Sequence, residues 1–357
     1  MDKLLVVSLR AASDVFRSYQ SPAFPSHIAD RPLEPRSVQR LSDAFRAHGQ
    51  FPIGDLAPLA CNIRALEAAS DFARGVHNQV VIIGPSGWGK SHLLRSAAHA
   101  IRLYQDRPVV VADAATWALA QRRVKDAAPL ILDDVQDVIR HARARHCLRD
   151  CLARRSEFGR PTLLGFNALR MCRDLHELLP VSAPWVCATI KEPDVQDREI
   201  VVRQIARKEG VVLSRAARRT IARMVAGNAR SIEGAMRRLR LVTDDWSEPA
   251  SVLPLCGLVM PYVVDGTEWD PREIVASVAT GVLEGTVAGR KVVKEITAFI
   301  LCRDMGLSES DVAAYVELPP GEVYRWVAIV EELLVQPEVE RAVQACQNAV
   351  LQSLCQL

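Results

Sequence analysis

The stretch Val80-Val-Ile-Ile-Gly84-Pro-Ser-Gly-Trp-Gly89-Lys90-Ser91 decides the fold of this chain. An apolar strand leads into a glycine-rich turn with the spacing G-x-x-x-x-G-K-[ST], and a helix is predicted to begin at Lys90. In that geometry the backbone N–H groups of the turn face a phosphate chain at the N-terminus of the helix. Lys90 is expected to contact the β- and γ-phosphates, and Ser91 Oγ to bind Mg²⁺. The pattern therefore predicts a nucleotide-binding loop that consists of Gly84, Pro85, Ser86, Gly87, Trp88, Gly89, Lys90 and Ser91.

A second motif supports the first. Residues 129–134 read Pro-Leu-Ile-Leu-Asp-Asp, an apolar strand that ends in Asp133 and Asp134. In a parallel sheet this strand end lies at the same edge as the phosphate-binding loop. Asp133 is then expected to hold Mg²⁺, and Asp134 to orient the attacking water. The alternative is that one of these residues only caps a helix.

The pattern around these motifs predicts a parallel α/β sheet, because five short apolar runs alternate with helical stretches. These runs are Val80–Ile83, Pro108–Ala112, Leu130–Leu132, Thr162–Phe166 and Trp185–Ile190.

The remainder is predicted to be helical, apart from an extended N-terminal arm with one helix near Leu4–Tyr19. Residues 194–244 form one helical region with Gly227-Asn228 as its only clear break, and Thr243–Pro271 is expected to be a loop. Four further helices are predicted at Arg272–Leu283, Lys291–Met305, Ser308–Val316 and Gly321–Val335.

The length and composition of the chain indicate a globular protein with more than one domain. A length of 357 residues suggests two or three domains. A content of 49% hydrophobic and 24% charged residues is typical of a globular chain. The nine cysteines contain no Cys-x-x-Cys pair and are expected to be reduced. No apolar stretch approaches the ~20 residues of a membrane span, and the apolar start is too short for a secretory signal, so we expect a cytoplasmic protein. Residues 265–357 contain seven Lys/Arg and fifteen Asp/Glu, a net charge of −8.

Three stretches resemble the DnaA/Hda branch of AAA+ ATPases. Leu132-Asp-Asp-Val-Gln136 is similar to that family's Walker B segment, and Thr162-Leu-Leu-Gly-Phe-Asn167 is similar to its sensor I strand. Residues 227–239, Gly-Asn-Ala-Arg-Ser-Ile-Glu-Gly-Ala-Met-Arg-Arg-Leu, resemble its sensor II helix. The resemblance implies that ATP and Mg²⁺ are the ligands, that Asn167 lies near the γ-phosphate, and that Arg230 distinguishes ATP from ADP. A plain surface arginine remains the alternative for Arg230, because Ser214–Arg240 contains eight Lys/Arg.

The resemblance also implies the architecture: a P-loop AAA+ parallel sheet of α/β type with a helical lid, followed by an all-α helix-turn-helix domain. The expected divisions are an N-terminal arm (1–49), a nucleotide-binding domain (50–192), a lid (193–246), a linker (247–270) and a C-terminal domain (271–357).

The chain departs from the family pattern at three places. The segment expected to carry an arginine finger, Leu178–Pro184, has no arginine, although Arg170 and Arg173 lie upstream. Only seventeen residues, Asp113–Pro129, stand where initiators carry a further helical insertion. The DNA-reading signature G-G-R-D-H-S-T-V corresponds to Glu317-Leu-Pro-Pro-Gly-Glu-Val-Tyr324, which lacks every base or phosphate donor.

The expected function is that of an ATP-binding, DnaA-like protein in the initiation of DNA replication or its regulation, with slow hydrolysis if any. Duplex DNA could bind through residues 291–326, and DnaA, the replicative helicase or the sliding clamp are candidate partners. Two alternatives stay open: a nucleotide-switched adaptor that does not touch DNA, and an ATP-dependent DNA-binding regulator of transcription or of mobile elements.

Overall fold

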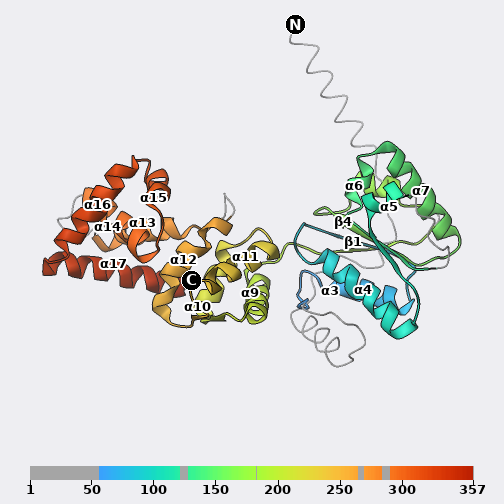
Figure 1. The fold of residues 1–357 in the computed structure, drawn as a ribbon, viewed down its shortest axis with the longest axis horizontal. Coiled ribbons are helices and arrows are strands. Elements are labelled where there is room, and N and C mark those ends of the chain that lie inside the picture. The colour runs from blue at the N-terminus through green and yellow to red at the C-terminus, as the bar shows by residue number, and fades with distance from the viewer. Residues whose placement is uncertain (1–55, 121–127, 182, 264–268, 284–289, 357) are drawn as a thin grey trace, which may run out of the picture.

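The computed structural model describes residues 56–120, 128–181, 183–263, 269–283 and 290–356. The predicted N-terminal arm and its helix lie outside these residues. Figure 1 shows an α/β unit joined to a mostly helical region. None of the helices in the described ranges is both long and apolar enough to span a membrane.

The α/β unit is built on a five-stranded parallel sheet with the order β2-β3-β4-β1-β5. The prediction of five parallel strands is confirmed. β1 is a fully buried interior strand, because it pairs with β4 on one side and with the edge strand β5 on the other. The strands are Gln79–Gly84 (β1), Val110–Asp113 (β2), Leu130–Asp133 (β3), Thr162–Asn167 (β4) and Val186–Thr189 (β5).

Helices cover both faces of the sheet (Figure 1). Successive side chains of a strand point to opposite faces, so Val80 and Ile82 pack towards α3 and α4, while Val81 and Ile83 pack in the cluster on the other face. The helices of the unit are Ile63–Arg74 (α3), Lys90–Gln105 (α4), Ala114–Ala120 (α5), Gln136–Ile139 (α6), Ala142–Glu157 (α7) and Arg173–Leu178 (α8).

Three helices follow the sheet and form the lid: α9 (Val195–Glu209), α10 (Arg215–Met224) and α11 (Ala229–Arg240). Each begins at a polar cap, because the side chains of Asp194, Ser214 and Asn228 accept a hydrogen bond from the N–H three residues on.

The prediction that Gly227-Asn228 is the only break in this region is wrong. α9 ends at Glu209, and the capping residue Gly210 has the left-handed φ of 75° that favours glycine. The chain then forms a two-residue strand, β6 (Val212–Leu213), which pairs with β7 (Asp245–Trp246).

The loop prediction for Thr243–Pro271 is also wrong. This segment contains α12 (Val252–Val259) between two 3₁₀ turns, η1 (Pro249–Ser251) and η2 (Met260–Tyr262). Pro254 is tolerated because it lies in the first turn of α12, where N–H groups have no partner within the helix. The buried face of α12 packs against α10 and α11, through Val252, Leu253, Leu255, Cys256 and Val259.

The C-terminal region contains the four predicted helices and one more. They are α13 (Pro271–Leu283), α14 (Arg290–Phe299) continued by a π-helical turn η3 (Ile300–Asp304), α15 (Glu309–Val316) and α16 (Pro320–Leu333). The additional helix, α17 (Pro337–Gln356), was not predicted, and it packs against α13. A three-residue turn joins α15 to α16. The domain limits given above stay predictions.

Candidate nucleotide-binding site

The glycine-rich turn lies between the end of β1 and the start of α4. Gly87 and Gly89 have φ values of 79° and 93°, a backbone region that is strained for other residues. Gly89 caps α4, and Lys90 is the first residue of that helix. The N-terminus of a sixteen-residue helix therefore opens onto the turn, as a phosphate-binding loop requires.

Lys90 is folded onto this turn. Its Nζ donates hydrogen bonds to the carbonyl oxygens of Gly84 (2.7 Å) and Pro85 (2.8 Å), and the residue is only 6% exposed. Burial lowers the pKa of Lys90, while the charges of Asp133 and Asp134 raise it and that of Arg230 lowers it further. The ammonium group thus lies within electrostatic reach of both predicted carboxylates and of the predicted sensor arginine.

The two carboxylates lie at the end of β3. Asp133 Oδ1 accepts a hydrogen bond from Asp134 N (3.0 Å), and Asp134 has a φ of 51°. A non-glycine residue in this region carries strain of about 1–3 kcal/mol and is held by its surroundings. On β4, Gly165 leaves room for Asp133, because a Cβ there would lie 2.6 Å from Asp133 Oδ1.

Gln136 bridges the two neighbouring strand ends. Its Nε2 donates to Asp134 Oδ1 (2.9 Å), and its Oε1 accepts from Asn167 N (2.9 Å). Asn167 itself lies beside Gly84 in the register of β4 and β1. Gln136 was not predicted as a site residue, although it is the last residue of the Walker B resemblance.

A cavity of about 440 Å³ opens between this turn and the lid. Its volume falls in the range of small-molecule pockets. The lid side comes from α9 and the start of α11, which contribute Val201, Gln204, Ile205, Lys208, Ala229, Arg230 and Glu233. The α/β side comes from Leu56, Ala57, Leu59, Cys61, Asn62, Ser86, Gly87, Trp88, Gly89, Lys90, Ser91, His92, Arg95 and Asp134.

The lid touches the phosphate-binding turn directly. A Cβ at Gly87 would lie 2.6 Å from Asn228 Cβ. Asn228 also caps α11, since its Oδ1 accepts from Ser231 N (3.0 Å). The same residue therefore places the start of α11, and Arg230 two residues on, at the mouth of the cavity.

The segment before α3 forms one wall of the cavity. Asn62 holds it, because its Oδ1 accepts from Leu59 N (2.8 Å) and its Nδ2 donates to Ala57 O (2.9 Å). Cys61 N donates to Asp197 Oδ2 on α9 (3.2 Å), which ties this wall to the lid. Burial raises the pKa of the Cys61 thiol, and the Asp197 charge raises it further. These residues carry no motif that could have been found in the sequence.

The predicted site residues divide into two groups. Ser86–Ser91, Asp134 and Arg230 line the cavity, with Arg230 exposed. Gly84, Pro85, Asp133 and Asn167 are not among its lining residues; they lie at the adjoining strand ends or hold Lys90. The hydroxyl of Ser91 and the carboxylate of Asp133 are oxygen donors of the kind Mg²⁺ prefers, and Mg²⁺ commonly takes one or two such groups together with nucleotide phosphates.

The described part of the predicted finger segment, 178–181 and 183–184, offers no cation to a neighbouring molecule. Arg173 upstream bonds Glu177 on its own helix (Nε to Oε1, 2.7 Å). Arg170 is exposed.

The predicted duplex-DNA surface has little available positive charge. Arg325 pairs with Glu322 (2.9 Å) and Arg303 with Glu331 (2.6 Å). Lys294 is exposed, and the side chain of Lys291 lies outside the described residues.

No protein-family model matches the chain. The curated protein "Chromosomal replication initiator protein DnaA" of Bdellovibrio bacteriovorus is 24% identical over 237 residues, which are 60% of this chain and 49% of that protein. The chain thus spans about half the length of this relative.

Several solved structures overlay on the chain. Domain III of DnaA from Thermotoga maritima covers 58% of this chain with a TM-score of 0.46 and 19% identity, over 94% of its own length. A DnaA bound to AMPPCP and single-stranded DNA covers 82% of this chain with a TM-score of 0.45 and 15% identity, over 95% of its own length. The fold follows from its own strand order, a five-stranded parallel sheet with the glycine-rich turn after β1, and not from these overlays. Over 237 residues the sequence is thus similar to a chromosomal replication initiator DnaA, and the parallel sheet with its glycine-rich turn agrees with the fold expected from the sequence.

Proposed function

We propose that the chain is an ATP-binding switch protein that acts in the initiation of DNA replication or in its control. The observation that carries this proposal is the cavity between the phosphate-binding turn and the lid, with Lys90 on one side and Arg230 on the other. The similarity to a replication initiator supports the process, and the cavity supports the ligand.

ATP would place its phosphates at the N-terminus of α4, where backbone N–H groups and the helix dipole favour negative charge. Lys90 would exchange its bonds to Gly84 O and Pro85 O for phosphate oxygens. This exchange is favourable because a charge-assisted bond to phosphate replaces bonds to neutral carbonyls. Ser91 and Asp133 would hold Mg²⁺, which supplies neutralising charge to the phosphates.

Hydrolysis, where it occurs, would use Asp134 to orient water and Asn167 as a polar group near the γ-phosphate. We propose that the reaction is slow. An arginine finger contributes about 10³–10⁵ in rate, and the chain carries no arginine in 178–184. A slow reaction suits a switch that stays in its ATP state until a partner acts on it.

Nucleotide titrations of the full chain test this proposal. We expect Lys90→Ala to lose most of the ATP affinity while keeping the far-UV circular dichroism and the melting behaviour of the wild type. Arg102→Ala, an exposed substitution about three turns further along the same helix and outside the cavity, is the control and should keep most of the affinity. Equal ATP affinity in Lys90→Ala and wild type would contradict the assignment of the turn.

A second candidate, an adaptor that does not bind duplex DNA, is favoured by one observation. The arginines Arg303 and Arg325 are paired with acids in a region of net charge −8. Binding of duplex DNA to the whole chain, measured at several salt concentrations, separates the candidates. Affinity that falls steeply with salt supports an initiator or DNA-binding regulator, because such a slope reports phosphate contacts. No binding at low salt supports the adaptor.

A further inference from the structure

Asp197 is a buried carboxylate that joins the lid to the wall of the cavity. It is the third residue of α9 and is only 8% exposed. Its Oδ2 accepts a hydrogen bond from Cys61 N (3.2 Å), and the thiol of Cys61 and the backbone of Ala60 also stabilise its charge by hydrogen bonding. Cys61 is 136 positions away in sequence, so the contact exists only when the lid and the segment before α3 are held together.

The burial of this carboxylate is costly. Desolvation raises the pKa of Asp197, the hydrogen bonds from Cys61 lower it, and the charge of Asp194 raises it again. Among the residues that the structure describes, Asp197 forms no ion pair. A buried charge without a cationic partner adds little to the stability of a fold. Its oxygens are satisfied only in one relative position of the two segments, so the group is better suited to fixing that position.

Cys61 is held from the side of the sheet as well. Its carbonyl oxygen accepts a hydrogen bond from Lys191 N (2.9 Å), directly after β5. The preceding residue, Ile190, donates its N–H to Ile83 O of β1 (2.7 Å). Cys61 therefore connects the end of the sheet, through its carbonyl group, with the lid, through its amide group.

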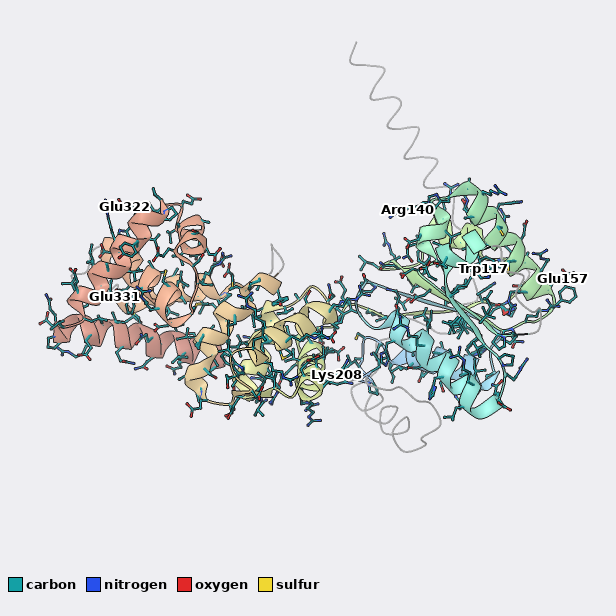
Figure 2. The ribbon with its side chains drawn as sticks, in the orientation of Figure 1. Trp117, Arg140, Glu157, Lys208, Glu322 and Glu331 are labelled. Atoms are coloured by element: carbon teal, nitrogen blue, oxygen red, sulfur yellow. The ribbon has the colours of Figure 1, made fainter. Side chains whose placement is uncertain are left out.

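Asp197 is the first of a row of residues on one face of α9. A helix repeats every 3.6 residues, so Val201, Gln204 and Lys208, at spacings of four, three and four residues, follow it on the same side. These three residues line the cavity, whereas Asp197 is not among the lining residues. Figure 2 shows Lys208, the last of the row, on the side of the lid next to the α/β unit. The contact of Asp197 with Cys61 thus fixes the cavity face of α9 relative to residues 56–62.

These two walls are the ones left for the nucleoside part of a nucleotide. The phosphates belong at the N-terminus of α4, where backbone N–H groups favour negative charge. Of the remaining walls, α9 and residues 56–62 supply the apolar side chains Leu56, Val201 and Ile205. Ligand pockets are lined mainly by apolar groups, and a flat base suits such a surface.

We propose that Asp197 is a positioning residue for the nucleoside part of the bound nucleotide. It holds α9 and residues 56–62 at the separation that receives the base, without touching the ligand. This inference rests on the function proposed above, because it concerns the same cavity. ATP and ADP share the nucleoside, so the contact of Asp197 supports both nucleotides equally, whereas Arg230 is expected to favour ATP.

Titrations of the full chain with ATP, ADP and inorganic tripolyphosphate, each with Mg²⁺, test the proposal. We expect Asp197→Ala to weaken the binding of ATP and of ADP by the same factor of about ten, since hydrogen bonds to a charged group are lost. Tripolyphosphate has no nucleoside and should bind the variant as it binds the wild type. Asp197→Asn should lose only about three- to fivefold in ATP affinity, because its amide oxygen still accepts one hydrogen bond.

Ser214→Ala is the matched control for the stability of the lid. Ser214 caps α10, since its Oγ accepts a hydrogen bond from Ala217 N (3.0 Å). Loss of a helix cap destabilises the lid but leaves the contact of Asp197 with Cys61 in place. This variant should unfold at a lower urea concentration than the wild type and keep its affinity for both nucleotides. Weakening of ATP binding as large as in Asp197→Ala would show that lid stability decides affinity, and would overturn the positioning role.

The remaining outcomes separate this inference from the proposed function. A wild type that binds no ATP would overturn the proposed function, and the inference with it. A wild type that binds ATP, together with an Asp197→Ala variant of equal affinity, would overturn the inference alone. Tripolyphosphate binding that falls as much as ATP binding would also overturn it, because the phosphate end would then depend on Asp197. If Asp197→Ala lacks the circular dichroism of the wild type, Asp197→Asn decides, and unchanged ATP affinity in that variant overturns the inference.

Discussion

Gln136 joins Asp134 to the end of the neighbouring strand: its Nε2 donates to Asp134 Oδ1 and its Oε1 accepts from Asn167 N, both at 2.9 Å. The side-chain amide therefore fixes the orientation of a carboxylate whose own backbone is strained, with a φ of 51°. Asn167 in turn lies beside Gly84, where the phosphate-binding turn begins. A displacement of the end of β3 or of β4 would therefore shift the other strand end, because the side chain of Gln136 is hydrogen-bonded to both.

We expect Gln136→Ala to slow ATP hydrolysis by roughly tenfold, a small part of the 10²–10⁴ that a positioned base supplies. ATP affinity should change little, because Gln136 does not line the cavity. Single-turnover hydrolysis and equilibrium binding measure the two effects separately. Asp134→Asn should lose more hydrolysis and also keep ATP binding.

The double variant shows whether Gln136 acts through Asp134. Residues that act as one unit have non-additive effects, so adding Gln136→Ala to Asp134→Asn should cost no further hydrolysis. Fully additive losses would mean that Gln136 has a separate role.

Lys90 should make ATP affinity sensitive to alkaline pH. Burial lowers the pKa of Lys90 in the ligand-free protein. Bound phosphate favours the charged ammonium, so ATP binding takes up a proton once the pH exceeds that pKa. ATP affinity should therefore fall as pH rises through a value below the ordinary lysine range.

Titrations at a series of alkaline pH values measure this fall, with circular dichroism to exclude unfolding. Lys90→Arg is the control, because a guanidinium stays charged throughout the range. An equal decline in both proteins would place the titrating group elsewhere.

Gly87 should be more sensitive to an added methyl group than its backbone conformation alone explains. Both Gly87 and Gly210 have left-handed φ values, 79° and 75°. A Cβ at Gly210 meets nothing within 4 Å, whereas one at Gly87 lies 2.6 Å from Asn228 Cβ. Gly210→Ala should lower the free energy of unfolding by about 1–2 kcal/mol, and Gly87→Ala by that amount plus about 1–3 kcal/mol of overpacking.

Urea denaturation gives these two values, and nucleotide titration adds a second readout. Gly87→Ala should also weaken ATP binding, because it separates the turn from the lid, while Gly210→Ala should not. Identical losses of stability in the two variants would show that the lid moves away from Gly87 without cost.

The parts of the fold that were predictable depend on local pattern. The apolar runs of β1 and β3 and the glycine-rich turn are continuous in sequence, so their strand and helix ends could be placed closely. The prediction failed where contacts are distant: β6 and β7 are two-residue strands that exist only as a pair. α12 was missed because Pro254 and Gly257 are typical of loops, whereas Gly257 here allows the carbonyl of Met305 to approach closely.

The residues of the candidate site also divide into those that a local sequence pattern predicts and those that depend on contacts between distant segments. Ser86–Ser91, Asp134 and Arg230 were found as motif residues, and they line one cavity. The bonds of Gln136 to two strand ends and of Asn62 to the cavity wall were not predictable, because they depend on how strands and loops meet in space. The contact of Asn228 with Gly87 joins residues 141 positions apart in sequence and needed the structure.

Arg230 provides the sharpest test of the nucleotide switch. It lies on the lid side of the cavity, and its charge acts on Lys90 across the site. Its planar, permanently charged group can bind phosphate oxygens bidentately. A charge-assisted contact of this kind contributes about 1.5–3 kcal/mol, or roughly 10- to 150-fold in affinity. Arg230→Ala should weaken ATP binding by about that factor.

ADP lacks the terminal phosphate, so its binding should change much less, and any preference of the protein for ATP should disappear. Parallel titrations of both nucleotides measure the ratio of their dissociation constants. Arg238→Ala is the control, because Arg238 is an exposed arginine of the same helix outside the cavity and should leave the ratio unchanged. If Arg230→Ala weakened ATP and ADP equally, the arginine would only shape the lid, since a group that contacts the terminal phosphate must act more strongly on the nucleotide that has one.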